Sequence, residues 1–357
     1  MRLQKTVIPP RQTTDPIVDV VVGGQYGSEG KGRVSAAVAS EYDVLTRVGG
    51  PNAGHTVVRE DGRTYICRHV PSGWATSNAK LIIGPAAIID ADILMREIEE
   101  FDLRPDRLAV DESAILIEPS DAAADMGLFT RIGTTGTGVS SASLRRITGR
   151  DGRTTLRRVS DDPRLARFAV DTVSLVDSLR VDRPGLKILL EGTQGFKLSI
   201  IHGAYPYVTS NDTTVGTLLA GAGLPWNWVR RVTVVCRRFP IRSGGSTGPM
   251  GEETSWRAVE DDGGHRVDAL SCKEVGSVSG RARRVAAFDF NGVRRAVRVN
   301  GATDIALTCM DHAAAADRGV SSLDGLSTAG QEFIRNVRRS PVARSLLSRL
   351  VLASKIL

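Results

Sequence analysis

The chain has 357 residues, of which 41% are hydrophobic and 24% are charged, an ordinary globular composition. Its 37 glycines follow no period and its apolar content is normal, which excludes collagen and low-complexity disorder. A formal charge of +7 favours an anionic partner, either nucleic acid or a phosphorylated small molecule. The four cysteines form no CxxC pair, so we expect a reduced cytoplasmic protein without a structural metal.

The first 16 residues are polar and contain prolines, without the apolar region of a signal peptide. We expect a loose leader there. Farther along the chain, no apolar stretch is long enough to span a membrane.

Short β-branched runs alternate with helical patterns along the chain. The first strand is expected at Ile17–Val22, where it runs into a glycine turn. Further strands are expected at Lys80–Ile83, Ala114–Ile117, Lys187–Leu190, Val232–Cys236 and Asp304–Leu307, and helices at Asp90–Phe101 and Val170–Leu179. This alternation predicts an α/β fold, a single large domain on a mostly parallel, doubly wound sheet with ligands at the carboxyl ends of the strands.

Two further segments have a distinct composition. Residues 133–162 are rich in Arg, Ser, Thr and Gly and predict a long functional loop or an interface. Residues 343–357 are amphipathic and predict a final helix that packs on the fold.

The strongest chemical signal is the loop after the first strand, residues 24–32, which reads GQYGSEGKG. A strand, a glycine turn, a lysine and then a helix let backbone N–H groups and a helix N-terminus hold a triphosphate. The loop is not a Walker A motif, because its spacing before Gly30-Lys31 is one residue longer and Gly32 replaces the Ser or Thr that holds Mg²⁺. Taken alone, the loop fits a plain glycine-rich turn equally well.

Two other loops contain groups suited to proton transfer and charge stabilisation. In Gly49–Thr56, small residues flank His55, whose pKa suits proton transfer near neutrality. In Glu191–Gly195, after an expected strand, Gln194 can donate to a developing oxyanion. For a lone histidine, a turn with a surface side chain is the simpler interpretation.

Two segments combine hydroxyl groups with arginines. Arg131–Gly138, with four arginines downstream of it, predicts a second phosphate-type site. Gly276–Arg284 suits the capture of a small dicarboxylate. The plain alternative for each is a solvated basic surface.

Together and in this order, these segments and Tyr205–Asn211 resemble the adenylosuccinate synthetase family. The family's motifs G-D-E-G-K-G, N-A-G-H-T, G-T-T-G, E-G-x-Q-G, Y-P-Y-V-T and an arginine-rich aspartate loop find matches from Gly24 to about Asp311. So many matches in one order outweigh the plain alternatives. The resemblance implies that residues 17–357 form one catalytic domain with the adenylosuccinate synthetase fold. It also implies a homodimeric, Mg²⁺-dependent ligase that joins a purine nucleotide to L-aspartate with a nucleoside triphosphate.

The resemblance implies roles for the matching residues. Ser28, His55 and Gln194 would act in catalysis, His55 at the transferring γ-phosphoryl group and Gln194 at the 6-oxyanion. The triphosphate would be held by Gly27, Glu29, Gly30, Lys31, Gly32, Gly54, His55, Thr56 and Asp311, and Mg²⁺ by Ser28 and Gly54. The purine nucleotide would contact Ser28, Asn52, Thr134, Thr135, Arg146, Arg150, Gln194, Thr209 and Arg281, with Arg146 or Arg150 reaching it from a neighbouring subunit. Aspartate would contact Val278, Ser279, Arg281 and Arg283.

Two departures from the family pattern bear on the substrates. Ser28 stands where the family has the Asp that takes N1–H from the base and ligates Mg²⁺. Because the other motifs are intact, we expect a changed substrate: guanine carries a 2-amino group beside N1, and the shorter, neutral serine makes room for it. Cys309 stands where the family has a lysine that helps to read the guanine of GTP, and a later segment is also altered, with Ser327–Gly330 as its nearest match. An adenine donor is therefore expected.

The pattern with serine in place of aspartate resembles the viral branch of the family. That branch converts dGMP and L-aspartate into N6-succino-2-amino-2′-deoxyadenylate, a precursor of 2-aminoadenine in phage DNA. We therefore expect dGMP, L-aspartate and ATP or dATP as partners, in the cytoplasm (of the host if the protein is viral), without membrane association or direct binding of nucleic acid. The group that accepts N1–H stays open among Ser28, a water and the phosphates.

The second hypothesis is ordinary adenylosuccinate synthesis from IMP with GTP, which Ser28 and Cys309 disfavour. A non-enzymatic nucleotide- or DNA-binding protein and a nucleotide-hydrolysing switch are the alternatives from other classes. The first leaves His55, Gln194 and the aspartate loop without a purpose. The second leaves the aspartate loop and the second nucleotide loop unexplained.

Overall fold

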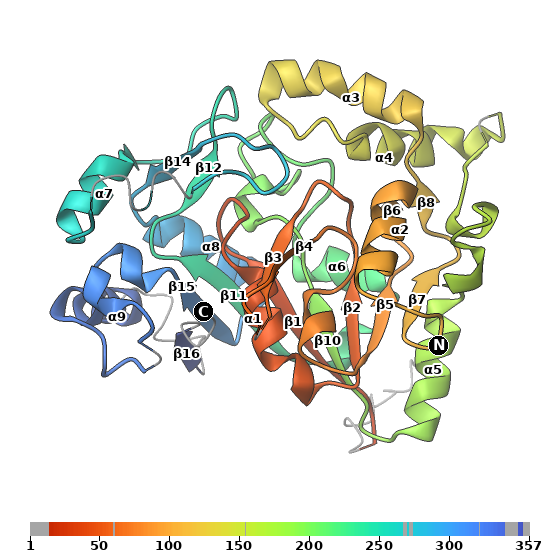
Figure 1. The fold of residues 1–357 in the computed structure, drawn as a ribbon, viewed down its shortest axis with the longest axis horizontal. Helices are drawn as coiled ribbons and strands as arrows, with labels where there is room; N and C mark the ends of the chain where they lie inside the picture. Colours follow the sequence, from red (N-terminus) through yellow and green to blue (C-terminus); the bar gives the residue numbers. More distant parts are fainter. Residues whose placement is uncertain are drawn as a thin grey trace, which may run out of the picture.

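A sheet of nine parallel strands forms the centre of the part of the chain that is described, in the order β16-β15-β11-β1-β10-β2-β5-β7-β9 (Figure 1). The computed structural model describes residues 14–59, 61–153, 155–266, 270, 274–320, 322–339 and 349–352. From one edge of the sheet to the other, the strands span Arg349–Leu352, Asp304–Thr308, Val229–Arg237, Ile17–Gly23, Lys187–Glu191, Val44–Arg47, Lys80–Ile83, Leu108–Asp111 and Ala169–Val170.

Helices cover both faces of this sheet. Alternate side chains of β1 enter opposite cores: Val20 and Val22 pack on one face and Val21 on the other. The core with Val21 contains side chains of α1 (Lys31–Val38) and α2 (Ala91–Glu100). The opposite core contains side chains of α5 (Thr172–Asp182), α6 (Val215–Ala222), α8 (Phe290–Asn300) and α9 (Thr328–Arg339). The arrangement is the doubly wound α/β fold that the alternation of strands and helices predicts.

Smaller elements surround the central sheet. They are the hairpin β3 (His55–Val58) and β4 (Thr64–Cys67), the pair β6 (Ile88–Ile89) and β8 (Ile115–Leu116), and the sheet of β12 (Ile241–Ser243), β14 (Arg283–Ala286) and β13 (Glu253–Thr254). Helices α3 (Pro119–Ile132) and α4 (Val139–Thr148) pack against each other, and α7 (Trp256–Asp262) lies beside the small sheet (Figure 1).

The predicted strands and helices are confirmed with ends that shift by a few residues, and two further segments differ from the prediction. Ala114–Ile117 shortens to β8, and Val170 ends strand β9 instead of beginning a helix. Residues 133–162 are not one long loop, since they contain α4, and residues 349–352 of the expected last helix form strand β16. The rest of residues 343–357 and residues 1–13 of the expected leader lie outside the described residues. No helix within the described residues has the length and apolar character needed to cross a membrane.

A tertiary cap explains why α4 forms in a segment of loop-like composition. Helix α4 begins after Gly138, whose left-handed conformation turns the chain. Asp125 of α3 then accepts hydrogen bonds from the first backbone N–H groups of α4, from Ser140 at 3.2 Å and from Ser141 at 3.0 Å. The cap comes from 15 residues earlier in the chain, where local composition cannot reveal it.

Candidate active site

Two adjoining cavities lie among the loops that follow strands β1, β2 and β10. The first, which we call the hydroxyl cavity, has a volume of about 140 Å³ and is lined by Thr134, Thr135, Thr137, Ser140 and Thr209 among others. The second, the loop cavity, has a volume of about 150 Å³ and is lined by Gly27, Ser28, Lys31, Gly54 and His55 among others. The residues common to both linings are Tyr26, Asn52, Thr135, Gln194, Leu198, Arg242 and Ser243. The position agrees with the expectation that ligands of a parallel sheet bind at the carboxyl ends of its strands.

The loop after β1 is organised by the buried carboxylate of Glu29. This carboxylate accepts hydrogen bonds from the backbone N–H of Gln25 at 3.0 Å and of Gly27 at 2.9 Å. It also pairs with the Lys31 ammonium at 2.7 Å, and both side chains are almost fully buried. The Glu29 side chain therefore faces the interior of the loop, and Lys31 is held at the edge of the loop cavity before any ligand binds.

Ser28 lies at the exposed corner of this loop. Its φ of 57° is in the left-handed region, between Gly27 at 84° and Gly30 at 92°. Its side chain is exposed and lines the loop cavity. None of the described residues that line the loop cavity is acidic, while Lys31 and Arg283 supply cationic groups. The loop cavity is therefore suited to anionic ligands.

His55 is held by a carboxylate at the end of a neighbouring strand. Its Nδ1 contacts Oε1 of Glu191, the last residue of β10. Glu191 also accepts hydrogen bonds from the Ser72 backbone N–H at 2.9 Å and hydroxyl at 2.6 Å, and Arg47 lies 3.4 Å away. A carboxylate is an acceptor, so Nδ1 carries the proton of a neutral imidazole and Nε2 keeps a free lone pair. Gly32 permits this packing, because a Cβ there would lie 2.7 Å from the His55 Cβ.

Burial controls the charge states of this pair. Burial lowers the pKa of His55 to about 4, and the Arg47 guanidinium acts in the same direction. Burial alone would raise the pKa of Glu191, but His55, Arg47 and the Ser72 hydroxyl outweigh it and bring the pKa to about 2. At neutral pH the site therefore holds a neutral histidine oriented by a carboxylate ion.

Gln194 lies between the two cavities in a constrained conformation. Its φ is 55°, an uncommon value for a residue with a side chain. Its Nε2 donates to Oδ1 of Asn52 at 3.0 Å. The two amide side chains thus meet at the junction of the cavities, where a donor can act on a ligand that extends through both.

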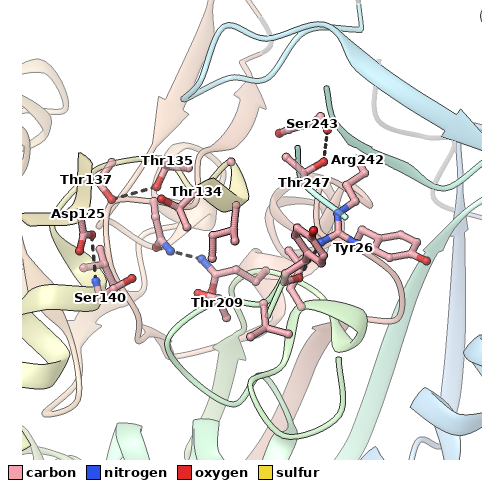
Figure 2. Close-up of a pocket in the computed structure, with 18 residues that line it drawn as sticks. Tyr26, Asp125, Thr134, Thr135, Thr137, Ser140, Thr209, Arg242, Ser243 and Thr247 are labelled. Atoms are coloured by element: carbon pink, nitrogen blue, oxygen red, sulfur yellow. Dashed lines mark hydrogen bonds between the residues drawn. The ribbon is translucent and has the colours of Figure 1, made fainter. Parts of the chain in front are cut away.

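The wall of the hydroxyl cavity is polar, and not all of its hydroxyl groups have a hydrogen-bond partner among the described residues. The Thr135 and Thr137 hydroxyls lie 3.1 Å apart, and Thr134 Oγ1 is buried with no hydrogen-bond partner in the described part of the chain (Figure 2). A buried hydroxyl without a partner is unfavourable in the free protein. This wall is therefore suited to a ligand with several acceptor oxygens.

Arg242 and Tyr26 support the region where the cavities meet. The Arg242 guanidinium donates to the carbonyl oxygens of Pro249 at 2.8 Å and Tyr207 at 2.7 Å. It also lies over the Tyr26 ring, 5.1 Å from its centroid. Burial lowers the pKa of Arg242 to about 10, which leaves it protonated at neutral pH. With its terminal nitrogens committed to carbonyl groups, Arg242 holds the shape of the cavity wall.

The expected aspartate loop contributes to the loop cavity, with one exception. Val278, Ser279 and Arg283 line the cavity, and Arg283 donates to Glu274 at 3.0 Å. Arg281 lines neither cavity. It donates to the carbonyl oxygens of Gly133 at 3.2 Å and Thr134 at 2.6 Å, which ties the aspartate loop to the wall of the hydroxyl cavity.

Most other predicted site residues are brought together, and a few are placed elsewhere. Asn52, Thr134, Thr135, Gln194 and Thr209 line the hydroxyl cavity. The remaining predicted residues, which line neither cavity, are Glu29, Gly30, Gly32, Thr56, Arg146, Arg150 and Asp311.

The contacts of these outlying residues differ. Arg146 donates to the carbonyl oxygens of Pro85 and Ser113, and Arg150 is exposed. Thr56 pairs with Ile66 in the β3–β4 hairpin. Asp311 follows β15, and its carbonyl oxygen lies 2.8 Å from His265 Nε2.

Several residues of the site were not predicted as functional. Glu191 was noted only as part of a motif, and Arg47 and Ser72 gave no sequence signal for their part in fixing His55. Tyr26, Tyr207, Ser243 and Thr247 also line the hydroxyl cavity. Tyr26 and Tyr207 had a usable signal, because they lie inside the glycine-rich loop and the Tyr205–Asn211 motif, whereas the segment with Ser243 and Thr247 was not singled out.

Comparisons of the sequence with known proteins all identify the same family. The family model described as adenylosuccinate synthetase matches residues 20–158 and 156–319. The adenylosuccinate synthetase of Methanocaldococcus jannaschii is 38% identical over 327 residues, which cover 89% of this chain and 89% of that protein. That of Methanococcus aeolicus is 36% identical over 327 residues, 89% of this chain and 92% of that protein.

Solved structures agree with the sequence comparison. The cyanophage S-2L succinoaminodeoxyadenylate synthetase (PurZ), bound to dGMP and to dATP as an energy donor, is similar with a TM-score of 0.74 and 27% identity. The match covers 94% of this chain and 91% of that one. The fully ligated adenylosuccinate synthetase of Plasmodium falciparum shares the fold, with a TM-score of 0.70, 23% identity and 84% and 78% of the two chains covered. The chain belongs to the adenylosuccinate synthetase family and is a ligase that forms a C–N bond with aspartate.

Proposed function

We propose that this ligase joins dGMP to L-aspartate, driven by ATP or dATP, and forms N6-succino-2-amino-2′-deoxyadenylate. The observation that carries the proposal is Ser28, which lines a cavity whose described lining contains no carboxylate. The family's Asp at this position would meet the 2-amino group beside N1 of guanine. A serine there removes both bulk and charge, so a 2-aminopurine base fits.

The chemistry divides into two steps. A purine 6-oxo group is amide-like and leaves poorly, so N1 first loses its proton while the 6-oxygen takes the γ-phosphoryl group of the triphosphate, and the nucleoside diphosphate is released. The aspartate amine then attacks C6, the C–O bond breaks, and orthophosphate leaves as the amine loses a proton. Gln194 would stabilise the 6-oxyanion, and His55 with Lys31 would act at the transferring phosphoryl group.

An adenine donor is supported by the end of strand β15. Cys309 follows this strand where the family has a guanine-reading lysine, and its φ of 52° marks a sharp turn. A thiol is a weak donor and cannot supply the contacts of an ammonium group. The similar cyanophage structure was solved with dATP as its energy donor.

Mg²⁺ is the cofactor that the family implies, and the residues present fit an ion that is bound together with the triphosphate. No group of three or more His, Cys, Asp or Glu side chains could hold a metal ion in the described parts of the chain. The loop cavity offers the Ser28 hydroxyl and the Gly54 carbonyl, both neutral oxygens. Mg²⁺ is usually held by substrate phosphates with several waters, so Ser28 and Gly54 would hold it only together with the triphosphate. The bound ion would neutralise charge on the phosphates.

A homodimer is part of the proposal, supported by the outer surface of helices α3 and α4. Met126, Leu144 and Ile147 are 49%, 60% and 58% exposed there, an unusual set of apolar side chains for a free surface. Arg150, just after α4, is exposed and its Nε donates to the Ile147 carbonyl at 2.8 Å, whereas Arg146 is half-buried and donates to two carbonyl groups of its own chain. We therefore propose that Arg150, and not Arg146, reaches the nucleotide site of the neighbouring subunit.

Ordinary adenylosuccinate synthesis from IMP with GTP is the second candidate. It is favoured by the archaeal relatives at 36% and 38% identity, which are ordinary synthetases.

A product assay by mass spectrometry separates the two candidates: dGMP or IMP is combined with ATP, dATP or GTP in the presence of aspartate and Mg²⁺. Succinylated 2-aminodeoxyadenylate from dGMP with an adenine donor is the expected product. Product from IMP with GTP alone would contradict the proposal.

A further inference from the structure

Thr247 lies on the wall of the hydroxyl cavity with the hydrogen of its hydroxyl already committed. Its Oγ1 donates to the carbonyl oxygen of Ser243 at 2.5 Å. Both residues line the cavity, and in the view of Figure 2 they lie on the opposite side from Thr134, Thr135 and Thr137. A hydroxyl has one hydrogen and two lone pairs, so a hydroxyl that donates to a carbonyl can offer a ligand only acceptor sites.

The conformation of Thr247 is set on several sides. A Cβ built on Gly133 would lie 2.6 Å from the Thr247 methyl carbon, so the methyl group packs directly against that glycine. The Thr247 backbone N–H donates to the Gly245 carbonyl at 2.8 Å. The next residue, Gly248, has a φ of 86° and packs against the Tyr207 ring. The side chain is buried, and this packing favours the rotamer in which its hydroxyl points to Ser243.

Several other acceptors around the hydroxyl cavity already take hydrogen bonds from the chain. The carbonyl oxygens of Gly133 and Thr134 accept hydrogen bonds from Arg281. The Asp125 carboxylate accepts hydrogen bonds from the N-terminus of α4. The Thr134 hydroxyl has no partner and can donate, which suits it to a phosphate oxygen. Thr247 thus offers the ligand an acceptor, and its complement is a hydrogen-bond donor on the ligand.

A purine deoxynucleoside 5′-monophosphate has few donors. On guanine they are N1–H and the 2-amino group, which the proposed function places beside Ser28 in the loop cavity. The remaining donor is the 3′-hydroxyl of the sugar. We infer that Thr247 accepts a hydrogen bond from the 3′-hydroxyl of the nucleotide, an inference that rests on the proposed function. The substrate class is then a 5′-monophosphate with a free 3′-hydroxyl.

The experiment compares dGMP with 2′,3′-dideoxyguanosine 5′-monophosphate as substrates of three proteins. The wild type should show a kcat/KM about tenfold higher for dGMP, because one hydrogen bond is lost with the dideoxy sugar. Thr247→Val keeps the shape of the side chain and removes the hydroxyl, so it should bring the two substrates to within about twofold of each other. Thr247→Ser restores the hydroxyl and should restore the preference.

Thr76→Val is the matched control, because the Thr76 hydroxyl donates to the Ala36 carbonyl at 2.6 Å but lines neither cavity. It should lose stability and keep the sugar preference. Equal use of the two sugars by the wild type, or a preference that survives in Thr247→Val, would overturn the inference. Turnover of IMP but not of dGMP would overturn the proposed function instead. The same comparison with 2′-deoxyinosine and 2′,3′-dideoxyinosine 5′-monophosphates would then decide the role of Thr247.

Discussion

The two cavities differ in how far their polar groups are satisfied by the chain itself. In the loop cavity, Lys31 is paired with Glu29 and His55 with Glu191, and both carboxylates are buried. In the hydroxyl cavity, the wall is built of neutral hydroxyls, and that of Thr134 has no partner. The first cavity is thus ordered before ligands bind, as transition-state stabilisation requires, whereas the second keeps a hydroxyl free for the substrate that we propose there. Mutations should therefore affect stability and turnover in one cavity, and substrate binding in the other.

Removing the carboxylate that orders the loop cavity should have the largest effect. In Glu191→Ala, Arg47 keeps a buried charge without its partner, and His55 loses the group that orients it. We expect a loss of about 3 to 5 kcal/mol in the free energy of unfolding, measured by urea denaturation. The fall in kcat should reach about 10²-fold or more.

Glu97→Gln is the matched control for this variant. Glu97 is also buried and accepts hydrogen bonds from the backbone of His69 and Val70, but it lines neither cavity. It should lower stability and leave kcat within about twofold of the wild type. An unchanged kcat in Glu191→Ala would contradict the role given to the His55–Glu191 pair.

Gln194→Ala should reduce kcat by about 10²- to 10³-fold, because it removes the donor that we propose for the 6-oxyanion. Gln194→Glu keeps the size of the side chain and replaces the donor by an anion, so it should be at least as inactive. Circular dichroism checks that both variants fold, since the position has a positive φ. A Gln194→Glu variant with near-normal turnover would exclude an oxyanion there.

The buried histidines predict a loss of stability in mild acid. Burial lowers the pKa of His55 and of His312 to about 4, and that of His69 well below 6.5. Between about pH 4 and 6.5 the unfolded chain therefore binds protons that the folded protein excludes, and stability rises with pH across this window. One such histidine raises the free energy of unfolding by on the order of 3 kcal/mol between pH 4 and pH 6.5. Thermal unfolding measured from pH 5 to 7 checks the sign, and a stability that falls with rising pH would contradict it.

Ser28→Asp should lower kcat/KM for dGMP by about tenfold or more, because the carboxylate meets the 2-amino group. Use of IMP should rise in the same variant. Ser28→Asn has a similar size without the charge and separates the two causes. A Ser28→Asp enzyme that uses dGMP as well as the wild type does would remove our explanation of this position.

Thr134→Val is the mildest test and concerns the hydroxyl cavity alone. Valine has nearly the same shape and removes a buried hydroxyl that has no partner, so the free protein should be as stable as the wild type or slightly more so. The KM for the nucleotide should rise by about three- to tenfold with kcat nearly unchanged. A clear loss of stability in the absence of nucleotide would show that the hydroxyl serves the fold.

Much of the fold could be predicted from periodicity and composition, because buried parallel strands have continuous apolar sequences. The prediction of β5 matches at both ends, and those of β1 and β15 each end one residue early. Strand β16 was predicted as a helix, since its amphipathic pattern does not reveal pairing with β15. Helix α4 was missed because Asp125 caps it from another element.

The site was predictable where its residues lie together in a motif. The glycine loop, His55, Gln194 and the threonines of the hydroxyl cavity all lie in such segments. The link between His55 and Glu191 spans 136 residues, and that between Arg281 and Thr134 spans 147. Contacts of this length depend on how strands are ordered in the sheet, which a single sequence does not state.

The backbone of Ser28 has a consequence for how substrate preference can change over time. A φ of 57° is tolerated better by Asp, Asn and Gly than by most other residues, because short polar side chains stabilise this conformation locally. An exchange between serine and aspartate at this corner therefore requires no rebuilding of the loop around Glu29 and Lys31. Under the proposed function, a change of purine substrate through residue 28 would therefore need no change of backbone conformation in either direction.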